Sequence, residues 1–110
     1  MPNQEIEIEK TFHALGDATR CAVIERLSRG PEVVSELAVG SRMALPSFTQ
    51  HLGVLERSGL VRSEKKGRVR TYYLEPRRLR EAQSWLKEQR KMWEKRLDQL
   101  DNYLQTIKEK

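Results

Sequence analysis

The sequence predicts a mainly α-helical domain of about five helices, with one β-hairpin and a long C-terminal helix. In most of the chain, apolar residues recur at the three- and four-residue spacing of a helical face. Residues 60–74 instead carry strand-forming residues on either side of a glycine turn. After residue 76, apolar residues recur at intervals of seven. The whole chain, 1–110, is therefore interpreted as a single domain.

Two helices are expected before residue 30. The first, at 5–15, has apolar residues on one face and is ended by Gly16. Asp17 is a favourable N-cap for the second, which should run to about Ser28. The apolar residues of the first face are Ile8, Phe12 and Leu15, and those expected to point inward from the second helix are Val23, Ile24 and Leu27.

Residues 33–59 predict two helices joined by a tight turn. Pro31 is suited to the first turn of a helix that includes 33–39. Residues 40–42 make the turn, and the second helix spans 44–59. One side of this second helix is apolar, with Phe48, Leu52 and Leu55 at helical spacing. The other side carries short polar residues, suited to reading base edges in a DNA major groove: Ser47, Thr49 and Gln50, next to His51.

The β-hairpin expected at 60–74 is strongly basic. Gly67 permits the positive φ of a tight turn. Glu64 is the one acid among five bases: Arg62, Lys65, Lys66, Arg68 and Arg70. Alone, such a hairpin is equally compatible with a solvated face. Directly after two helices of this kind, it predicts a wing whose cations contact DNA phosphates or the minor groove.

The C-terminal helix, expected at 77–108, predicts an assembly of two chains. At about 1.5 Å per residue it would span about 48 Å, more than so small a domain can cover. Its first turns should pack on their own domain, whereas the part beyond Trp93 needs a partner. Homodimerisation is expected through this helix and the N-terminal one, by Ile8, Phe12, Leu86, Trp93, Leu97, Leu100, Leu104 and Ile107.

Composition limits the possible partners and the expected location of the protein. The 110 residues include 21 Lys and Arg against 16 Asp and Glu, a net charge of +5 that permits polyanionic partners without identifying them. No apolar run approaches the roughly 20 residues of a membrane span, and the N-terminus does not resemble a secretory signal. Cys21 is the single cysteine, so no disulfide can form within the chain. A cytoplasmic protein without membrane contact is expected.

Three motifs occur in order: ALGDATR at 14–20, QHLGVLERSGLV at 50–61 and GRVRTYYL at 67–74. With them, residues 10–75 resemble the ArsR/SmtB family of small bacterial winged helix-turn-helix repressors. The resemblance implies a dimer that binds an imperfect inverted repeat in a promoter, with the helix at 44–58 in the major groove. By position, the base- and phosphate-facing residues are Ser47, Thr49 and Gln50, and those of the wing are Lys66, Arg68 and Arg70. Ala44 departs from the Ser that commonly caps this helix.

Metal sensing, a known activity of the family, is not expected, nor is any cofactor. Val33 and Ser35 stand where some members have cysteines, and the last helix has no histidine. His13 could pair with an acid such as Glu9, but two ligands do not close a site, and packing or a phosphate contact suits His51 better. Cys21 is interpreted as a half-buried helix residue rather than a redox switch. The aromatic residues Trp85, Trp93 and Tyr103 are interpreted as packing rather than as a ligand pocket.

No phosphate loop, activated nucleophile or carboxylate pair indicates an enzyme. The sequence therefore predicts a sequence-specific transcriptional regulator, a repressor that binds double-stranded DNA as a homodimer. It does not identify an inducer. Two alternatives stay open: a winged-helix module that docks on an acidic protein, and an architectural protein that binds DNA without regard to sequence.

Overall fold

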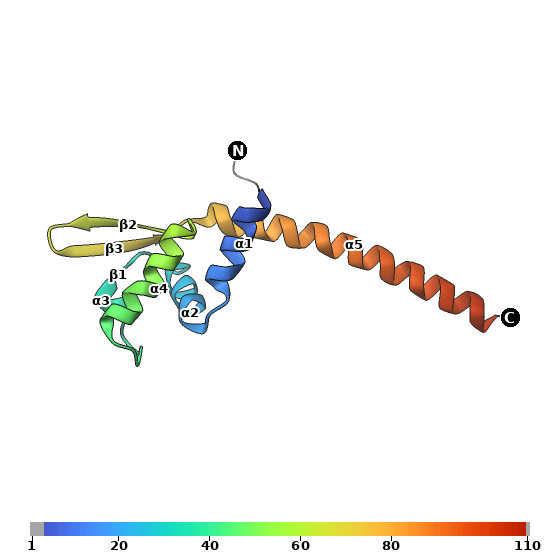
Figure 1. Cartoon of the computed structure of the whole chain (residues 1–110), viewed down its shortest axis with the longest axis horizontal. Helices are drawn as coiled ribbons and strands as arrows, with labels where there is room; N and C mark the ends of the chain where they lie inside the picture. Colours follow the sequence, from blue (N-terminus) through green and yellow to red (C-terminus); the bar gives the residue numbers. More distant parts are fainter. Residues whose placement is uncertain (1–3, 110) are drawn as a thin grey trace.

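The computed structural model describes residues 4–109, which form five helices and one small antiparallel sheet (Figure 1). The helices are α1 (Gln4–Leu15), α2 (Ala18–Leu27), α3 (Val34–Leu37), α4 (Leu45–Arg57) and α5 (Pro76–Lys108). The strands are β1 (Glu32–Val33), β2 (Val61–Lys66) and β3 (Val69–Leu74). The predicted number of helices and the hairpin are confirmed, and the bounds of α4 lie within two residues of those expected.

The prediction for residues 31–39 was wrong in two respects. Pro31 does not begin a helix, because the chain first forms the two-residue strand β1. Glu32 and Val33 pair with Tyr72 and Thr71 of β3, so the sheet has three strands in the order β1-β3-β2. Only four residues are then left for α3. Pairing with a distant strand thus outweighs local helix propensity here.

A compact core joins α2, α4 and the base of the hairpin. Leu52, Leu55 and Leu60 are fully buried, and Phe48 is nearly so. The inward residues predicted for α2 are confirmed, since Val23, Ile24 and Leu27 are all buried. The buried cluster also takes in Val61 and Tyr72, which come from the two hairpin strands. The core therefore fixes α4 and the base of the wing on one body.

Gly59 makes the sharp turn from α4 into β2. Its φ is +81°, and the amides of Gly59 and Leu60 donate to the carbonyls of Glu56 and Leu55, the pattern of a glycine-terminated helix. The Arg78 side chain crosses directly over this glycine, and an added Cβ would lie 2.9 Å from Arg78 Nε. Backbone conformation and close packing therefore both require glycine here.

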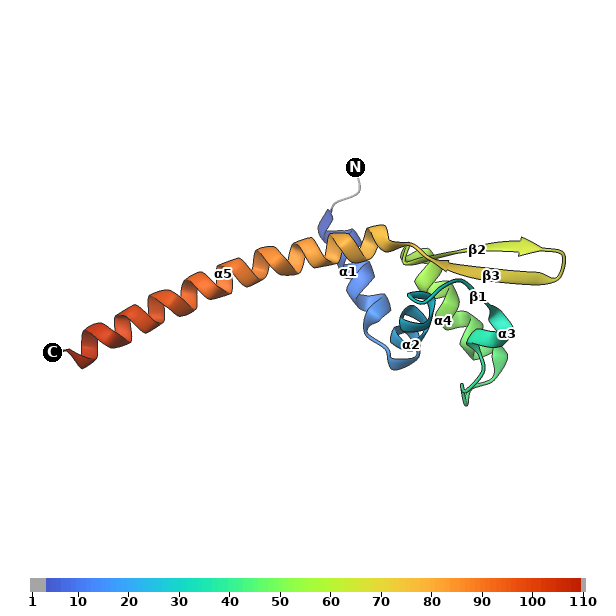
Figure 2. The same cartoon turned by 180° about the vertical axis from the view of Figure 1, so that it is seen from behind.

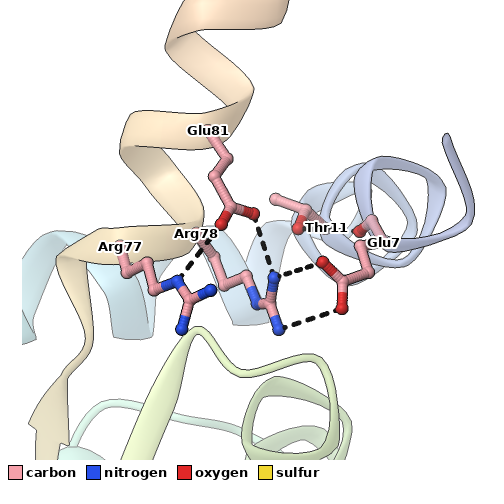
Figure 3. Close-up of polar contacts among 5 residues, drawn as sticks. All are labelled: Glu7, Thr11, Arg77, Arg78 and Glu81. Atoms are coloured by element: carbon pink, nitrogen blue, oxygen red, sulfur yellow. Dashed lines mark hydrogen bonds and ion pairs between the residues drawn. The ribbon is translucent and has the colours of Figure 1, made fainter. Parts of the chain in front are cut away.

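Arg78 also ties α5 to α1 (Figure 3). Its Nη1 lies 2.7 Å from Glu7 Oε2 and 2.9 Å from Glu81 Oε2, and its Nη2 lies 3.3 Å from Glu7 Oε1. The hydrogen bond from Arg78 lowers the pKa of Glu81 from its ordinary value. Nearby, the rings of Phe12 and Trp85 pack edge to face, with their centroids 5.5 Å apart. The first turns of α5 thus pack on their own domain, as expected.

The rest of α5 extends away from the body as a single helix (Figures 1 and 2). From residue 90 onward every described residue of this helix is exposed. These include apolar residues expected to mediate homodimerisation, with Trp93 at 69% and Leu97 at 59% exposure. Among the described helices, none combines the length and the apolar character needed to cross a membrane.

Candidate nucleic-acid interface

Helix α4 presents a polar face away from the core. Phe48, Leu52 and Leu55 point inward, while Ser47, Thr49 and Gln50 are all exposed. Thr49 Oγ1 donates to the carbonyl of Pro46 at 2.9 Å, which leaves its lone pairs free to accept. Ala44 supplies no side-chain cap, as its identity implies. The helix is held by its buried side and can offer the other side to a DNA groove.

The ring of His51, a residue also expected at the DNA interface, contacts Arg20 of α2. Its Nδ1 lies 2.9 Å from Arg20 Nη1 and 3.5 Å from Asp17 Oδ2. Arg20 in turn donates from Nε to the carbonyl of Ala14 at 2.6 Å, at the end of α1. The backbone hydrogen bond from Arg20 lowers the pKa of Asp17, and the charge of Arg20 acts in the same direction. This geometry links α4 to α1 and α2 through the His51 ring.

The basic residues of the wing fall into two groups. Arg62 forms ion pairs with Glu64 in the hairpin, at 2.7 Å, and with Glu75 directly after it, at 2.8 Å. Its guanidinium also lies over the ring of Tyr73. Arg70 Nη1 donates to Ser63 Oγ at 2.8 Å. By contrast, no ion pair among the side chains of residues 7–109 involves the exposed Lys65, Lys66 or Arg68 at the tip.

The tip itself is a tight turn. Lys66 pairs with Val69 across it, and Gly67 has the predicted positive φ, here +62°. Figures 1 and 2 show this tip and the N-terminal end of α4 at the end of the molecule remote from the C-terminus of α5. The tip of the wing and the beginning of α4 therefore lie at the same end of the molecule (Figures 1 and 2).

Sequence reasoning missed two parts of this site. Nothing local in the motif ALGDATR shows that its Arg20 reaches His51, 31 positions away. Ser63 and Glu56, whose side chains are 2.6 Å apart, were given no role. The spacing of seven residues between them crosses the turn at Gly59, so no helical or strand periodicity could connect them.

The remaining candidate groups lie outside this interface. Cys21 is half-buried, as expected, and its Sγ donates to the carbonyl of Leu15 at 2.9 Å. Among the side chains of residues 7–109, no three from His, Cys, Asp or Glu gather closely enough to hold a metal ion. His13 is exposed beside Glu9 and Lys10, in a shallow groove between α1 and the end of α4.

A helix-turn-helix followed by a β-hairpin on one core defines a winged helix-turn-helix domain. A protein-family model described as a helix-turn-helix domain matches residues 15–64. The chain belongs to the ArsR family of transcriptional regulators, because its sequence is 48% identical to that of an ArsR family transcriptional regulator with a known crystal structure. That match covers 86% of this chain and 97% of the other, with a TM-score of 0.80.

Two curated relatives agree. The HTH-type transcriptional regulator Rv2034 of Mycobacterium tuberculosis is 41% identical over 68 residues, which cover 62% of this chain and 64% of that protein. The transcriptional repressor SdpR of Bacillus subtilis is 24% identical over 79 residues, covering 72% of this chain and 88% of SdpR. Both relatives are named as regulators of transcription.

Proposed function

We propose that this protein is a cytoplasmic, homodimeric repressor that binds an inverted-repeat operator in double-stranded DNA. The exposed polar face of α4 carries the proposal, together with the wing, whose three tip cations form no ion pair with any described residue. Ser47, Thr49 and Gln50 would meet base edges and nearby phosphates, while Lys66 and Arg68 would neutralise phosphates. His51 would act by holding α4 in place, given its contacts with Arg20 and Asp17.

The dimer is supported by the uncovered seam of α5. Apolar residues on one side of this helix keep about half or more of their surface exposed: Leu86, Trp93, Leu97, Leu100, Leu104 and Ile107. So continuous an apolar row is typical of a surface that another helix covers. A second copy of the chain is the partner that an inverted repeat requires, because its twofold symmetry matches that of a homodimer. Phe12 and Ile8 of α1 lie at the base of this helix and would border the interface.

Repression, rather than activation, is supported by the name of the relative SdpR. It would act by occupying promoter DNA. The two alternative functions differ from it in measurable ways: a protein-docking module would show no DNA sequence preference, and an architectural protein would bind without discriminating the operator.

The experiment is footprinting on the DNA that flanks the gene of this protein, with competition against random DNA. We expect protection of two half-sites about 34 Å apart, one turn of the double helix. Protection of a single half-site would contradict the dimer. Binding without preference over random DNA would favour the architectural alternative, and an absence of DNA binding would favour protein docking.

The wing gives a further prediction. Replacing Lys66 and Arg68 with Ala should weaken binding to operator and random DNA alike, because phosphate contacts carry no sequence information. The log–log salt dependence should become shallower by about one unit for each phosphate contact that the substitutions remove. The measurement is a titration at several salt concentrations, with Lys95→Ala on exposed α5 as a control for the change in charge. If affinity and slope are both unchanged, the wing does not contact DNA.

A further inference from the structure

One side-chain link joins the wing to α4. Ser63 Oγ donates to Glu56 Oε1 at 2.6 Å and accepts from Arg70 Nη1 at 2.8 Å. Glu56 lies in the last turn of α4, Ser63 on β2 and Arg70 on β3. The hydroxyl therefore uses its donor toward the helix and its acceptor toward the opposite strand.

The register of the sheet shows why this link matters. Ser63 faces Tyr72, which is also the partner of Glu32 in β1, so the three strands run side by side at that level. Thr71, the partner of Glu64, still pairs with Val33 of β1. Beyond that level, residues 65–70 form only a two-stranded ribbon, because β1 contributes two residues. A two-stranded ribbon in water is marginally stable and free to bend. The tip of the wing thus depends on what fixes its base.

Other polar contacts of the wing do not supply that support. Arg62 contacts Glu64, Tyr73 and Glu75, all within the hairpin or at its exit. In the part of the chain that the structure describes, the bond from Ser63 to Glu56 is the one side-chain hydrogen bond between the hairpin and α4. Ser63 is half-buried and lies two residues before the unsupported ribbon begins.

We propose that Ser63 is a positioning residue, which fixes the angle between the wing and α4 through Glu56 and Arg70. This inference rests on the proposed function, because the angle matters only if both elements bind the same DNA. With the angle fixed, Lys65, Lys66 and Arg68 reach phosphates at a set distance from the bases under α4. Arg70 serves this link rather than acting as a free phosphate contact like the residues at the tip. Preorganisation lowers the entropy lost when the wing binds.

The test is Ser63→Ala, read from the salt dependence of DNA binding. Operator affinity should fall roughly 3- to 10-fold, the range expected for one hydrogen bond. The salt slope should become shallower by about one unit although no charge has been removed, because a mobile wing keeps fewer phosphate contacts. Ser63→Thr retains the hydroxyl and should restore both affinity and slope. Ser28→Ala is the matched control: it removes a serine hydroxyl that donates to a helix carbonyl at 2.8 Å, away from the wing.

Two further variants make the result specific. In a protein that already carries Lys66→Ala and Arg68→Ala, Ser63→Ala should have a smaller additional effect, because two of the three contacts it positions are gone. Glu56→Ala breaks the same link from an exposed position of α4 and should also make the slope shallower. Its affinity is not the readout, since loss of an acid by itself favours binding to DNA.

The outcomes separate the two proposals. If the unmodified protein binds DNA and Ser63→Ala keeps the full salt slope, Ser63 is not a positioning residue. The same conclusion holds if the effect of Ser63→Ala adds fully to that of the wing variant. The proposed regulator would then still stand. If the unmodified protein binds no DNA, both proposals fail.

Discussion

Truncation of the chain after Lys91 is expected to give a folded monomer that has lost most of its operator affinity. The truncation removes the distal seam: Trp93, Leu97, Leu100, Leu104 and Ile107. In one chain these side chains lie exposed on α5 and contribute nothing to the core, so the body should keep its fold. A partner helix would bury them, and each large apolar side chain is worth roughly 1.5–3 kcal/mol when fully buried.

Operator affinity should follow the loss of the dimer. Two linked recognition helices bind one operator with an avidity that can exceed single-site binding by about 100-fold or more. A monomer keeps one α4 and one wing, and therefore only half of the contacts. Sedimentation and gel shift of the truncated protein measure the two effects separately.

Full-length variants provide the control for this truncation. Leu100→Asp places a charge in the seam and should dissociate the dimer without shortening α5. Asn102→Ala, on the opposite side of the helix, should leave assembly unchanged. A full-length protein that sediments as a monomer at micromolar concentration would contradict the dimer. A truncated protein that still dimerises would move the interface to α1, around Ile8 and Phe12.

Local patterns predicted most of the fold because most of its elements have local causes. The apolar spacing of Phe48, Leu52 and Leu55 predicted the buried side of α4, and these residues are buried. Asp17 was predicted as the N-cap of α2, and its carboxylate accepts from the amide of Arg20 at 3.0 Å. Caps, helical faces and glycine turns involve residues a few positions apart, which a sequence shows directly.

The features that were missed depend on residues far apart in the chain. Strand β1 has two residues and exists because Glu32 and Val33 meet β3, about 40 positions later. No period can be read from two residues. The same holds for the contact of Arg20 with His51, which joins residues 31 positions apart in the chain. A polar residue on a helix can face DNA or a neighbouring helix, and only the packing of the chain decides between them.

Replacement of Gln50 with Ala is expected to lower the preference for operator over random DNA by about 1–3 kcal/mol, the value of one bidentate base contact. Gln50 is exposed on the side of α4 opposite Phe48 and Leu52, so its loss should not disturb the core. The effect of Gln50→Ala should differ in kind from that of the wing variant with Lys66→Ala and Arg68→Ala. Binding to random DNA and the salt slope should stay the same, because an uncharged amide releases no counterions.

Competition gel shift with operator and random DNA measures this preference directly, and thermal unfolding checks that the fold is intact. Gln105→Ala removes the same amide from an exposed position of α5, remote from α4, and should leave the preference unchanged. If Gln50→Ala discriminates the operator as well as the unmodified protein, Gln50 does not read bases. Base readout would then pass to the exposed neighbours Ser47 and Thr49, the remaining polar side chains on this face that can donate and accept at a base edge.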